Sequence, residues 1–280
     1  ERASRVTSMR FRAELFDSSA LSGILSSLEK ISNDVYIILD REYIHFRIVK
    51  QSASEEQVFV QIQENALFED YRIESKNNNT IGISTRASNL VVALRTGAQA
   101  QKIIVKLAKK DNQPCLKIEM STGSNLITQD VSVRLLTSKQ IREKSEPHYQ
   151  DPEVKLEMPN VRMLRNVINR MKSVSEDIVL TANSTGELSL KVTAELVSIR
   201  TFYKGLQWRG GDDQPNSERK AVTAQCRMSI AKLKKVLETK ILAVSSYIVG
   251  CIVEHQAFVI FAELGQNLGS AVFYVPLLTM

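Results

Sequence analysis

Short hydrophobic runs, many of them alternating with polar residues, recur along this chain of 280 residues. The segments 34–40 and 43–49 flank a short polar turn and predict a β-hairpin. Further runs of this kind lie at 58–62, 80–84, 103–107, 115–120, 131–135, 154–158, 178–182, 188–192, 196–202, 221–228, 247–253, 257–262 and 271–276. Because so many short strands are separated by polar turns, the sequence predicts extensive antiparallel sheet.

Four segments carry apolar residues at helical spacing instead. We expect Asp17 to cap the first, Thr85 or Ser88 to open the second, and Asn160 and Ser229 to open the last two, since short polar side chains accept hydrogen bonds from the first amides of a helix. The apolar residues expected to face the sheets are Leu21, Ile24, Leu25, Leu28 and Ile31; Leu90 and Leu94; Val161, Leu164, Val167, Ile168 and Met171; and Ile230, Leu233, Val236 and Leu237.

The two halves of the chain repeat this pattern at a constant shift of 143 residues, which carries Leu21 onto Leu164 and Leu90 onto Leu233. The same shift relates further pairs in predicted strands: Asp34 and Asp177, Val35 and Ile178, Ile37 and Leu180, Val105 and Ile248, and Ile118 and Phe261. Chance agreement is easy over one helix but difficult over four elements in one register. We therefore predict an α+β fold of two duplicated domains, each with two helices on a largely antiparallel sheet.

The composition of the connecting segments predicts the domain boundaries. Residues 1–8 are expected to be an appended remnant that precedes a natural start at Met9. The first domain is expected at 9–136, a polar connecting segment at 137–152 and the second domain at 153–280. A second polar stretch, at 207–220, predicts a mobile loop within the second domain.

The overall composition excludes several classes of protein. Hydrophobic residues make up 43% of the chain and charged residues 24%, as in a globular protein, and no apolar run approaches the roughly 20 residues of a membrane span. We therefore expect no membrane partner. The formal net charge of +6 favours a polyanionic partner. Cys115, Cys226 and Cys251 are too few and too scattered for a disulfide framework or a zinc site, and are expected to be packed thiols.

The positive charge is concentrated in three of the four predicted helices. Segment 160–172 nets +4, segments 229–240 and 85–102 each net +3, and segment 17–32 nets −1. At about 100° per residue, these basic side chains point away from the apolar stripes. One basic helix face is most often a solvated surface, but three on a duplicated scaffold favour contact with phosphates. No helix-turn-helix, zinc-finger or aromatic pattern for reading bases is present, which favours contact with the DNA backbone alone.

The sequence predicts no catalytic site. His45, His148 and His255 are scattered, and no HExxH, GxSxG, Walker A or GxGxxG pattern occurs. His45 and His255 are expected to be hydrogen-bonded structural residues in or beside strands. Asp34 and Asp177 recur at the same turn of each copy, where turn chemistry explains them better than a metal does. We expect no enzyme activity, metal or cofactor, and we keep a nuclease with a basic groove as an alternative.

A duplicated α+β domain with basic helices resembles the sliding-clamp fold of PCNA, in which helices line the hole of a ring and antiparallel sheets form its outside. Several short segments are more specifically similar to the Hus-type subunit of the nine-one-one DNA-damage checkpoint clamp. They are MRFRA at 9–13, ITQDV at 127–131, DPEV at 151–154, TGELSLK at 185–191, ELV at 195–197 and FYVP at 273–276.

This resemblance implies a DNA-encircling subunit of a heterotrimeric ring with two Rad-type checkpoint clamp subunits. It implies an ATP-dependent clamp loader that places the ring on damaged or recessed double-stranded DNA in the nucleus. It also implies a platform for checkpoint kinase activation and for repair enzymes. A homotrimeric replication processivity clamp is the alternative assembly.

The resemblance also assigns residues to surfaces. Those expected to face DNA are Arg95, Arg162, Arg165, Asn169, Arg170, Lys232, Lys234 and Lys235. The first predicted helix departs from this pattern, because serines and Glu29 occupy its outer face with Lys30 as its only base. Edge strands near 103–109 and 196–202 are expected to contact neighbouring subunits. Clamps of this fold receive short peptides beneath the connecting segment, so a partner groove is expected at Thr137, Ile141 and Tyr149.

Overall fold

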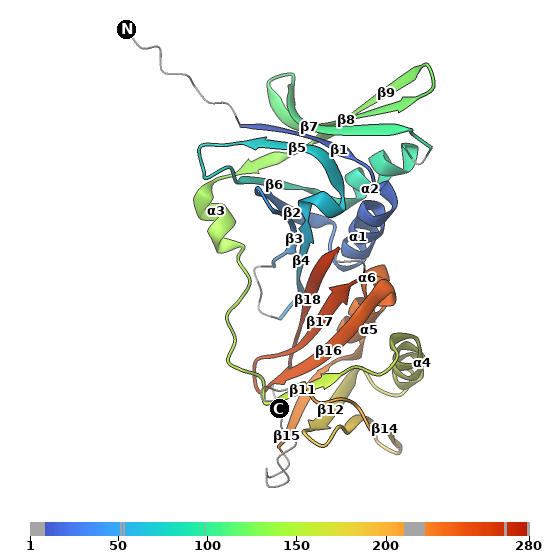
Figure 1. Ribbon diagram of the computed structural model, residues 1–280. Coiled ribbons are helices and arrows are strands. Elements are labelled where there is room, and N and C mark those ends of the chain that lie inside the picture. The colour runs from blue at the N-terminus through green and yellow to red at the C-terminus, as the bar shows by residue number, and fades with distance from the viewer. Residues whose placement is uncertain are drawn as a thin grey trace. The chain divides into compact units, whose positions relative to one another are not determined.

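The computed structural model describes residues 9–50, 52, 54–97, 99–209, 222–265 and 268–278. These residues form two compact units (Figure 1). The first comprises residues 9–49, 59–146 and 268–269, and the second comprises residues 50–58, 147–265 and 270–278. One of the crossings between the units, at residues 146–147, lies within the segment expected to connect two domains, and others lie at 49–50, 58–59 and 269–270. The expected remnant at 1–8 and residues 210–220 of the expected mobile loop lie outside the described residues.

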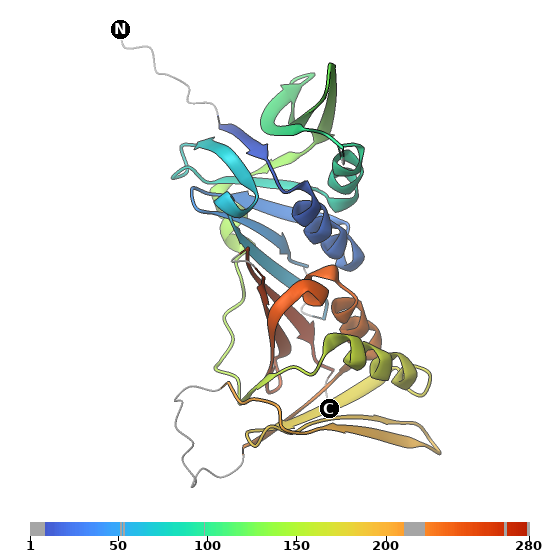
Figure 2. The ribbon, with the colours of Figure 1, turned by 45° about the vertical axis from the view of Figure 1, so that its right-hand side comes forward.

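The first unit contains two antiparallel sheets, three α-helices and a short 3-10 helix. Its elements are β1 (Arg10–Leu15), α1 (Ser18–Ile31), β2 (Asp34–Leu39), β3 (Tyr43–Ile48), β4 (Gln57–Gln63), η1 (Glu64–Ala66), β5 (Phe68–Glu74), β6 (Ile81–Arg86), α2 (Ala87–Thr96), β7 (Lys102–Lys110), β8 (Gln113–Thr122), β9 (Asn125–Ser132), β10 (Arg134–Leu136) and α3 (Ser138–Glu143). The strand orders are β5-β1-β7-β8-β9 and β10-β6-β2-β3-β4. Helices α1 and α2 pack together on one side of the sheets, and α3 lies on the other (Figures 1 and 2).

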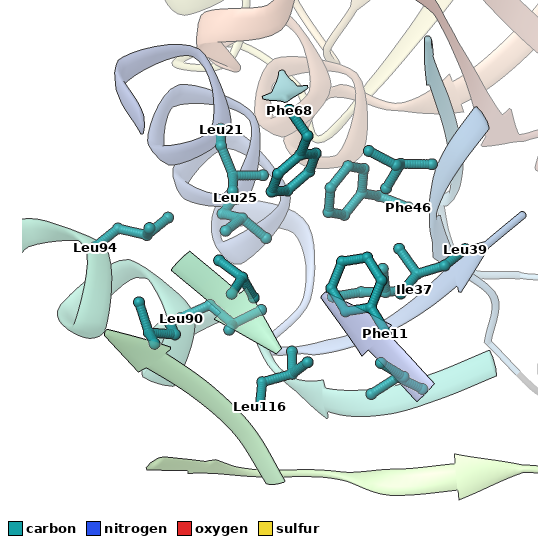
Figure 3. A pocket seen from close by; sticks show the side chains of 14 residues that line it. Phe11, Leu21, Leu25, Ile37, Leu39, Phe46, Phe68, Leu90, Leu94 and Leu116 are labelled. Carbon is teal, nitrogen blue, oxygen red and sulfur yellow. The ribbon is translucent and has the colours of Figure 1, made fainter. Parts of the chain in front are cut away.

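The core of the first unit lies between these sheets and the helix pair (Figure 3). Leu21 and Leu25 of α1 and Leu90 of α2 point toward Phe11 and Phe46 from the strands. All five side chains are buried, and complete burial of a leucine or phenylalanine contributes about 1.5–3 kcal/mol. The apolar stripes of both helices therefore face the sheets, as the sequence predicts.

The second unit has the same kind of structure. Its elements are β11 (Val154–Glu157), α4 (Val161–Met171), β12 (Asp177–Asn183), β13 (Leu188–Thr193), β14 (Ser198–Tyr203), β15 (Thr223–Ser229), α5 (Ile230–Leu237), α6 (Lys240–Val244), β16 (Ser245–Val253), β17 (Ala257–Leu264) and β18 (Gly269–Pro276). The strand orders are β18-β17-β16-β11 and β14-β13-β12-β15. Helix α4 contacts both α5 and α6, and the three lie on the same side of the sheets (Figure 2).

The repeat found in the sequence is a structural repeat. The shift of 143 residues carries the bounds of β7 onto those of β16, and it carries α1 onto α4 and α2 onto α5. The pairing β7-β8-β9 in the first unit matches β16-β17-β18 in the second, and β6-β2-β3 matches β15-β12-β13. The prediction of a duplicated α+β fold with antiparallel sheets is therefore confirmed.

Of the four predicted helix starts, Asp17 and Asn160 are confirmed as side-chain caps, Ser229 is the N-cap residue of α5 but makes no side-chain capping hydrogen bond, and the start predicted at Thr85 or Ser88 is wrong. The carboxylate of Asp17 accepts a hydrogen bond from the Ala20 amide at 2.8 Å, and the Asn160 side chain accepts from the first amides of α4. Neither Thr85 nor Ser88 caps α2. Instead, Asn33 Oδ1 accepts a hydrogen bond from the Ser88 amide at 3.2 Å. Asn33 lies 55 positions earlier in the chain, so helical periodicity around α2 carries no information about it.

Strand pairing corrects one of the expected subunit edges. The segment 103–109 lies in β7, which pairs with β1 on one side and with β8 on the other. Residues 103–106 are paired on both sides, so β7 is an interior strand along this stretch and the expectation of an edge strand there is wrong. Strand β9 ends this sheet of the first unit, and β14 ends a sheet of the second unit.

The connecting segment is partly helical rather than wholly irregular. Thr137 and Gln140 form a capping box at the start of α3, in which each side chain binds the backbone amide of the other.

The chain that follows β14 pairs with β11. Gln207 and Arg209 make backbone hydrogen bonds to this strand. This pairing satisfies backbone groups at that edge of the sheet.

The remaining polar groups of the sequence analysis have structural positions. Cys115 and Cys226 are buried and Cys251 is half-buried, all three as free thiols, and burial raises the pKa of Cys226 to about 12. In the part of the chain that is described, histidine, cysteine and acidic side chains form no group that suits a metal ion. No helix within the described residues has the length and apolar character needed to cross a membrane.

Candidate nucleic-acid interface

Helix α4 separates apolar and basic residues onto opposite faces. Leu164, Ile168 and Met171 are buried in the core of the second unit, to which α4 belongs, whereas Arg162 and Arg170 are exposed. Arg165 lies at the margin and is half-buried. The exposed face also carries Asn166 and Asn169 at the spacing of successive helical turns. Four of the predicted DNA-facing residues, Arg162, Arg165, Asn169 and Arg170, therefore belong to one helix, with the two exposed arginines and Asn169 on its outer side.

The arginines of α4 have no acidic partner in the part of the chain that the structure describes. There, Arg162, Arg165 and Arg170 form no ion pair, and α4 itself contains no acidic residue. Arg162 also lies in the first helical turn, where the helix dipole disfavours a cation by about 0.3–1 kcal/mol. This arrangement does not favour helix stability. It produces a concentrated positive potential that suits a phosphate backbone.

The lysines of α5 are in a different environment, because each one contacts a neighbouring acceptor. Lys234 lies 3.5 Å from Glu238 of the next helical turn. Lys235 lies 4.0 Å from Glu56, whose side chain is only 9% exposed. Lys232 donates a hydrogen bond to the backbone carbonyl of Ser54. The predicted DNA-facing lysines are all half-buried, and they are partly satisfied within the free chain.

Helices α1 and α2 of the first unit carry fewer basic residues than α4 and α5. Arg95 is exposed in the last turn of α2, where a cation is favoured by the helix dipole. On α1, Ser19 is exposed, and Ser22 and Ser26 are half-buried, so the surface of this helix is polar and has little positive charge. Basic residues are therefore more numerous on α4 and α5 of the second unit than on α1 and α2 of the first.

The residues of the expected partner groove lie in two different units. Thr137 caps α3 in the first unit, and Ile141 packs onto Gly82, where an added Cβ atom would lie 2.6 Å from Ile141 Cγ1. Tyr149 belongs to the second unit, and its ring centroid lies 5.2 Å from that of Tyr274. Each hydrophobic side chain of the expected groove therefore already packs against its own unit.

The histidine in β3 is structural, as expected. His45 Nε2 lies 3.0 Å from Oδ2 of Asp40, while Asp40 Oδ1 accepts hydrogen bonds from the amides of Glu42 and Tyr43. Burial lowers the pKa of His45 below its usual 6.5, and the neighbouring Asp40 only partly offsets this effect. The imidazole is therefore neutral near pH 7 and stabilises the β2–β3 turn.

Sequence reasoning missed the acidic segment that contacts α5. Glu55 and Glu56 precede β4, about 175 positions before the lysines of α5, so no local pattern relates them. It also missed α3, although the spacing of Thr137 and Gln140 is the known signature of a capping box. A search for this signature would have found the helix.

A duplicated α+β chain whose paired helices (α1 with α2, and α4 with α5) lie on one side of antiparallel sheets has the architecture of a sliding clamp. The structure is similar to that of PCNA from Thermococcus kodakaraensis, with a TM-score of 0.69 and 16% identity over 96% of this chain and 100% of that one. It is also similar to proliferating cellular nuclear antigen from Entamoeba histolytica, with a TM-score of 0.73 and 10% identity over 96% of this chain and 99% of that one. These similarities show the fold.

The sequence comparisons identify the family. The family model described as Hus1-like protein matches residues 9–278, so the chain belongs to the Hus1-like family. It is 29% identical over 268 residues to Checkpoint protein hus1 of Schizosaccharomyces pombe, covering 91% of this chain and 93% of the relative. It is 28% identical over 209 residues to Checkpoint protein HUS1 of Homo sapiens, covering 71% and 74%. The resemblance inferred from short segments is confirmed.

Proposed function

We propose that this chain is the DNA-encircling subunit of a heterotrimeric checkpoint sliding clamp. Membership of the Hus1-like family and the PCNA fold support this function. The observation that carries the DNA contact is the acid-free basic face of α4. In this proposal the chain is a nuclear platform for checkpoint kinase activation and repair enzymes, has no catalytic residue or cofactor, and is placed on damaged or recessed DNA by an ATP-dependent loader.

The proposed contact with DNA is electrostatic and independent of sequence. Arginines on α4 neutralise phosphates and release condensed counterions, which gives affinity that falls steeply with salt. Since the sequence contains no base-reading motif, the contacts carry no sequence information and let the ring slide along the duplex. Asn169 adds a neutral hydrogen-bonding group on the same face. The lysines of α5 contribute at the margin of this surface, and Arg95 of α2 is proposed as a separate phosphate contact of the first unit.

The proposed ring contacts use the two end strands. On β9, Leu126 is 66% exposed, and just before β14, Leu196 is 96% exposed. Val197, Ile199 and Phe202 add further exposed apolar surface around β14. Unpaired strand edges flanked by apolar side chains are suited to strand addition by a neighbouring chain. We assign these two edges to the two Rad-type subunits.

A peptide partner is proposed at the connecting segment, at Thr137, Ile141 and Tyr149. The support is the apolar surface of Ile141 and Tyr149. An incoming peptide would have to replace contacts that these side chains already make. If titration with clamp-binding peptides leaves the amide signals of 137–152 unchanged, this part of the proposal is wrong.

The assembly is tested by light scattering at moderate salt. The purified chain is expected to be a particle near 31.5 kDa, and to enter a closed ring only when both Rad-type subunits are added. A particle of three times that mass from the chain alone would instead indicate a homotrimeric processivity clamp. Divalent-metal-dependent cleavage of DNA by the pure chain would indicate a nuclease.

A further inference from the structure

A small basic pocket lies beside α5 in the second unit. It is lined by Lys50, Glu55, Glu56, Ala231, Lys232 and Lys235. The segment 50–56 and the first turns of α5 thus bring three lysines and two glutamates to one place, although these parts lie far apart in the sequence.

The charges of this pocket do not balance. Lys50 pairs with Glu55 at 3.4 Å, and Lys235 lies 4.0 Å from Glu56. Among the described residues, the third ammonium group, that of Lys232, contacts the neutral carbonyl of Ser54 and no carboxylate. Within this part of the chain, one positive charge beside residue 54 is therefore not balanced, and the local potential there favours an additional anion.

Ser54 is the residue best placed to supply that anion. Ser54 is exposed, so its side chain is accessible to an enzyme. Its hydroxyl forms a 2.6 Å hydrogen bond with the hydroxyl of Ser52, which is also exposed. Glu55 and Glu56 follow it directly in the sequence. A serine with an acidic C-terminal flank is a suitable substrate for a protein kinase whose peptide site is basic.

We propose that Ser54 is a phosphorylation site and that Lys232 binds the phosphate. The Ser54 hydroxyl oxygen attacks the γ-phosphorus of ATP in the active site of such a kinase. The bond between the γ-phosphorus and the oxygen that bridges it to ADP breaks, ADP leaves, and the hydroxyl proton passes to the base of the kinase. The resulting phosphoserine carries about −1.5 to −2 charges at pH 7 and forms charge-assisted hydrogen bonds with the ammonium group of Lys232.

Phosphorylation would also change the DNA-facing surface, and this consequence rests on the proposed function. Lys232 would be neutralised within the chain, whereas the arginines of α4 would keep their charge. The assembled ring should then lose about one unit of the slope of log affinity against log salt.

The site itself is tested on the isolated full chain, without DNA or partners. Phosphoserine is incorporated at position 54 during synthesis, and its phosphorus NMR signal is followed against pH. The second phosphate pKa is expected to fall from about 6 to about 5.5 or below, since a neighbouring cation stabilises the dianion. In the Lys232→Met variant it should return to about 6. The matched control Lys240→Met, at an exposed lysine of α6, should leave it low.

A pKa that Lys232→Met does not change would overturn the assignment of Lys232, even if the chain proves to be a clamp subunit. The modification is tested separately by incubating the unmodified chain with ATP and an acid-directed kinase. Mass spectrometry is expected to find the phosphate on Ser54 and to lose it in Ser54→Ala. Phosphate found only on Ser52 or elsewhere would refute the choice of serine.

Discussion

Helices α4 and α5 are both basic, but their cations are in different states. The arginines of α4 have no ion pair among the described residues, whereas the lysines of α5 contact Ser54, Glu238 and Glu56. A cation that is already paired gains less from a phosphate, because the first contact must be lost. A count of basic residues therefore overestimates the capacity of α5 to bind an additional phosphate.

The difference arises from what each helix packs against. One side of α5 lies beside the acidic segment 50–56, which forms a pocket with Lys232 and Lys235. Helix α4 contacts α5 and α6, its apolar stripe is buried, and its exposed arginines form no ion pair with any acidic residue that the structure describes. Two elements with similar composition therefore have different capacities for binding anions.

The largest expected effect is on the α4 arginines. Replacing Arg162, Arg165 and Arg170 by alanine in the assembled ring should reduce the slope of log affinity against log salt by about 2–3, because each phosphate contact contributes about 0.9. Binding to duplex DNA by fluorescence anisotropy at several salt concentrations measures this slope. Circular dichroism checks that the variant is folded, and an unchanged slope in a folded variant would exclude α4 as the phosphate contact.

Replacing Lys232, Lys234 and Lys235 by alanine should reduce the same slope by only about 1, although the change in formal charge is the same. The reason is that these lysines are partly satisfied within the chain. The two triple variants are compared in one titration series. Equal slopes for the two would contradict the distinction between the helices.

The start of α4 offers a smaller perturbation. Asn160→Ala removes the side chain that accepts hydrogen bonds from the amides of Arg162 and Met163, and it should lower the free energy of unfolding by about 1 kcal/mol. Urea denaturation measures this loss. Asn160→Asp keeps an accepting oxygen and is expected to retain most of the stability; an equal loss in both variants would argue against capping.

The smallest expected effect is a gain. Glu55→Gln combined with Glu56→Gln removes the acidic groups beside Lys50 and Lys235, so these lysines become available to phosphates. The salt slope should rise by less than about 1. As a control, Glu263→Gln removes one negative charge from an exposed residue of β17 in the same unit and is expected to leave the slope unchanged; Glu55→Gln alone is the variant of equal charge change. If the Glu263 variant shows the same rise, general repulsion by net charge explains the result.

The fold was largely predictable because the hydrophobic periods of strands and helices are local features. One constant shift of 143 residues, which relates Leu21 to Leu164 and holds over several elements, was enough to indicate the duplication. The edge position of β9 was not predictable, since strand order depends on pairing between distant segments such as β1 and β7. The capping of α2 by Asn33 was missed for the same reason.

For the candidate site, the sequence indicated which helices are basic. It did not indicate which of their cations are paired with an acceptor within the chain. The exposure of Arg162 and Arg170 follows from helical geometry. The contact of Lys235 with Glu56 depends on how a distant segment packs, which no periodicity records. The strength of each cation as a phosphate ligand therefore needs the three-dimensional structure.

The central claim is that the exposed face of α4 lies against DNA. A photo-crosslinking amino acid placed at Asn166, which is exposed on that face, tests it directly in the assembled ring loaded on circular duplex DNA. We predict efficient crosslinking to DNA from position 166 and none from position 263 on β17, at any DNA sequence. Crosslinking from position 263 with none from position 166 would contradict the account.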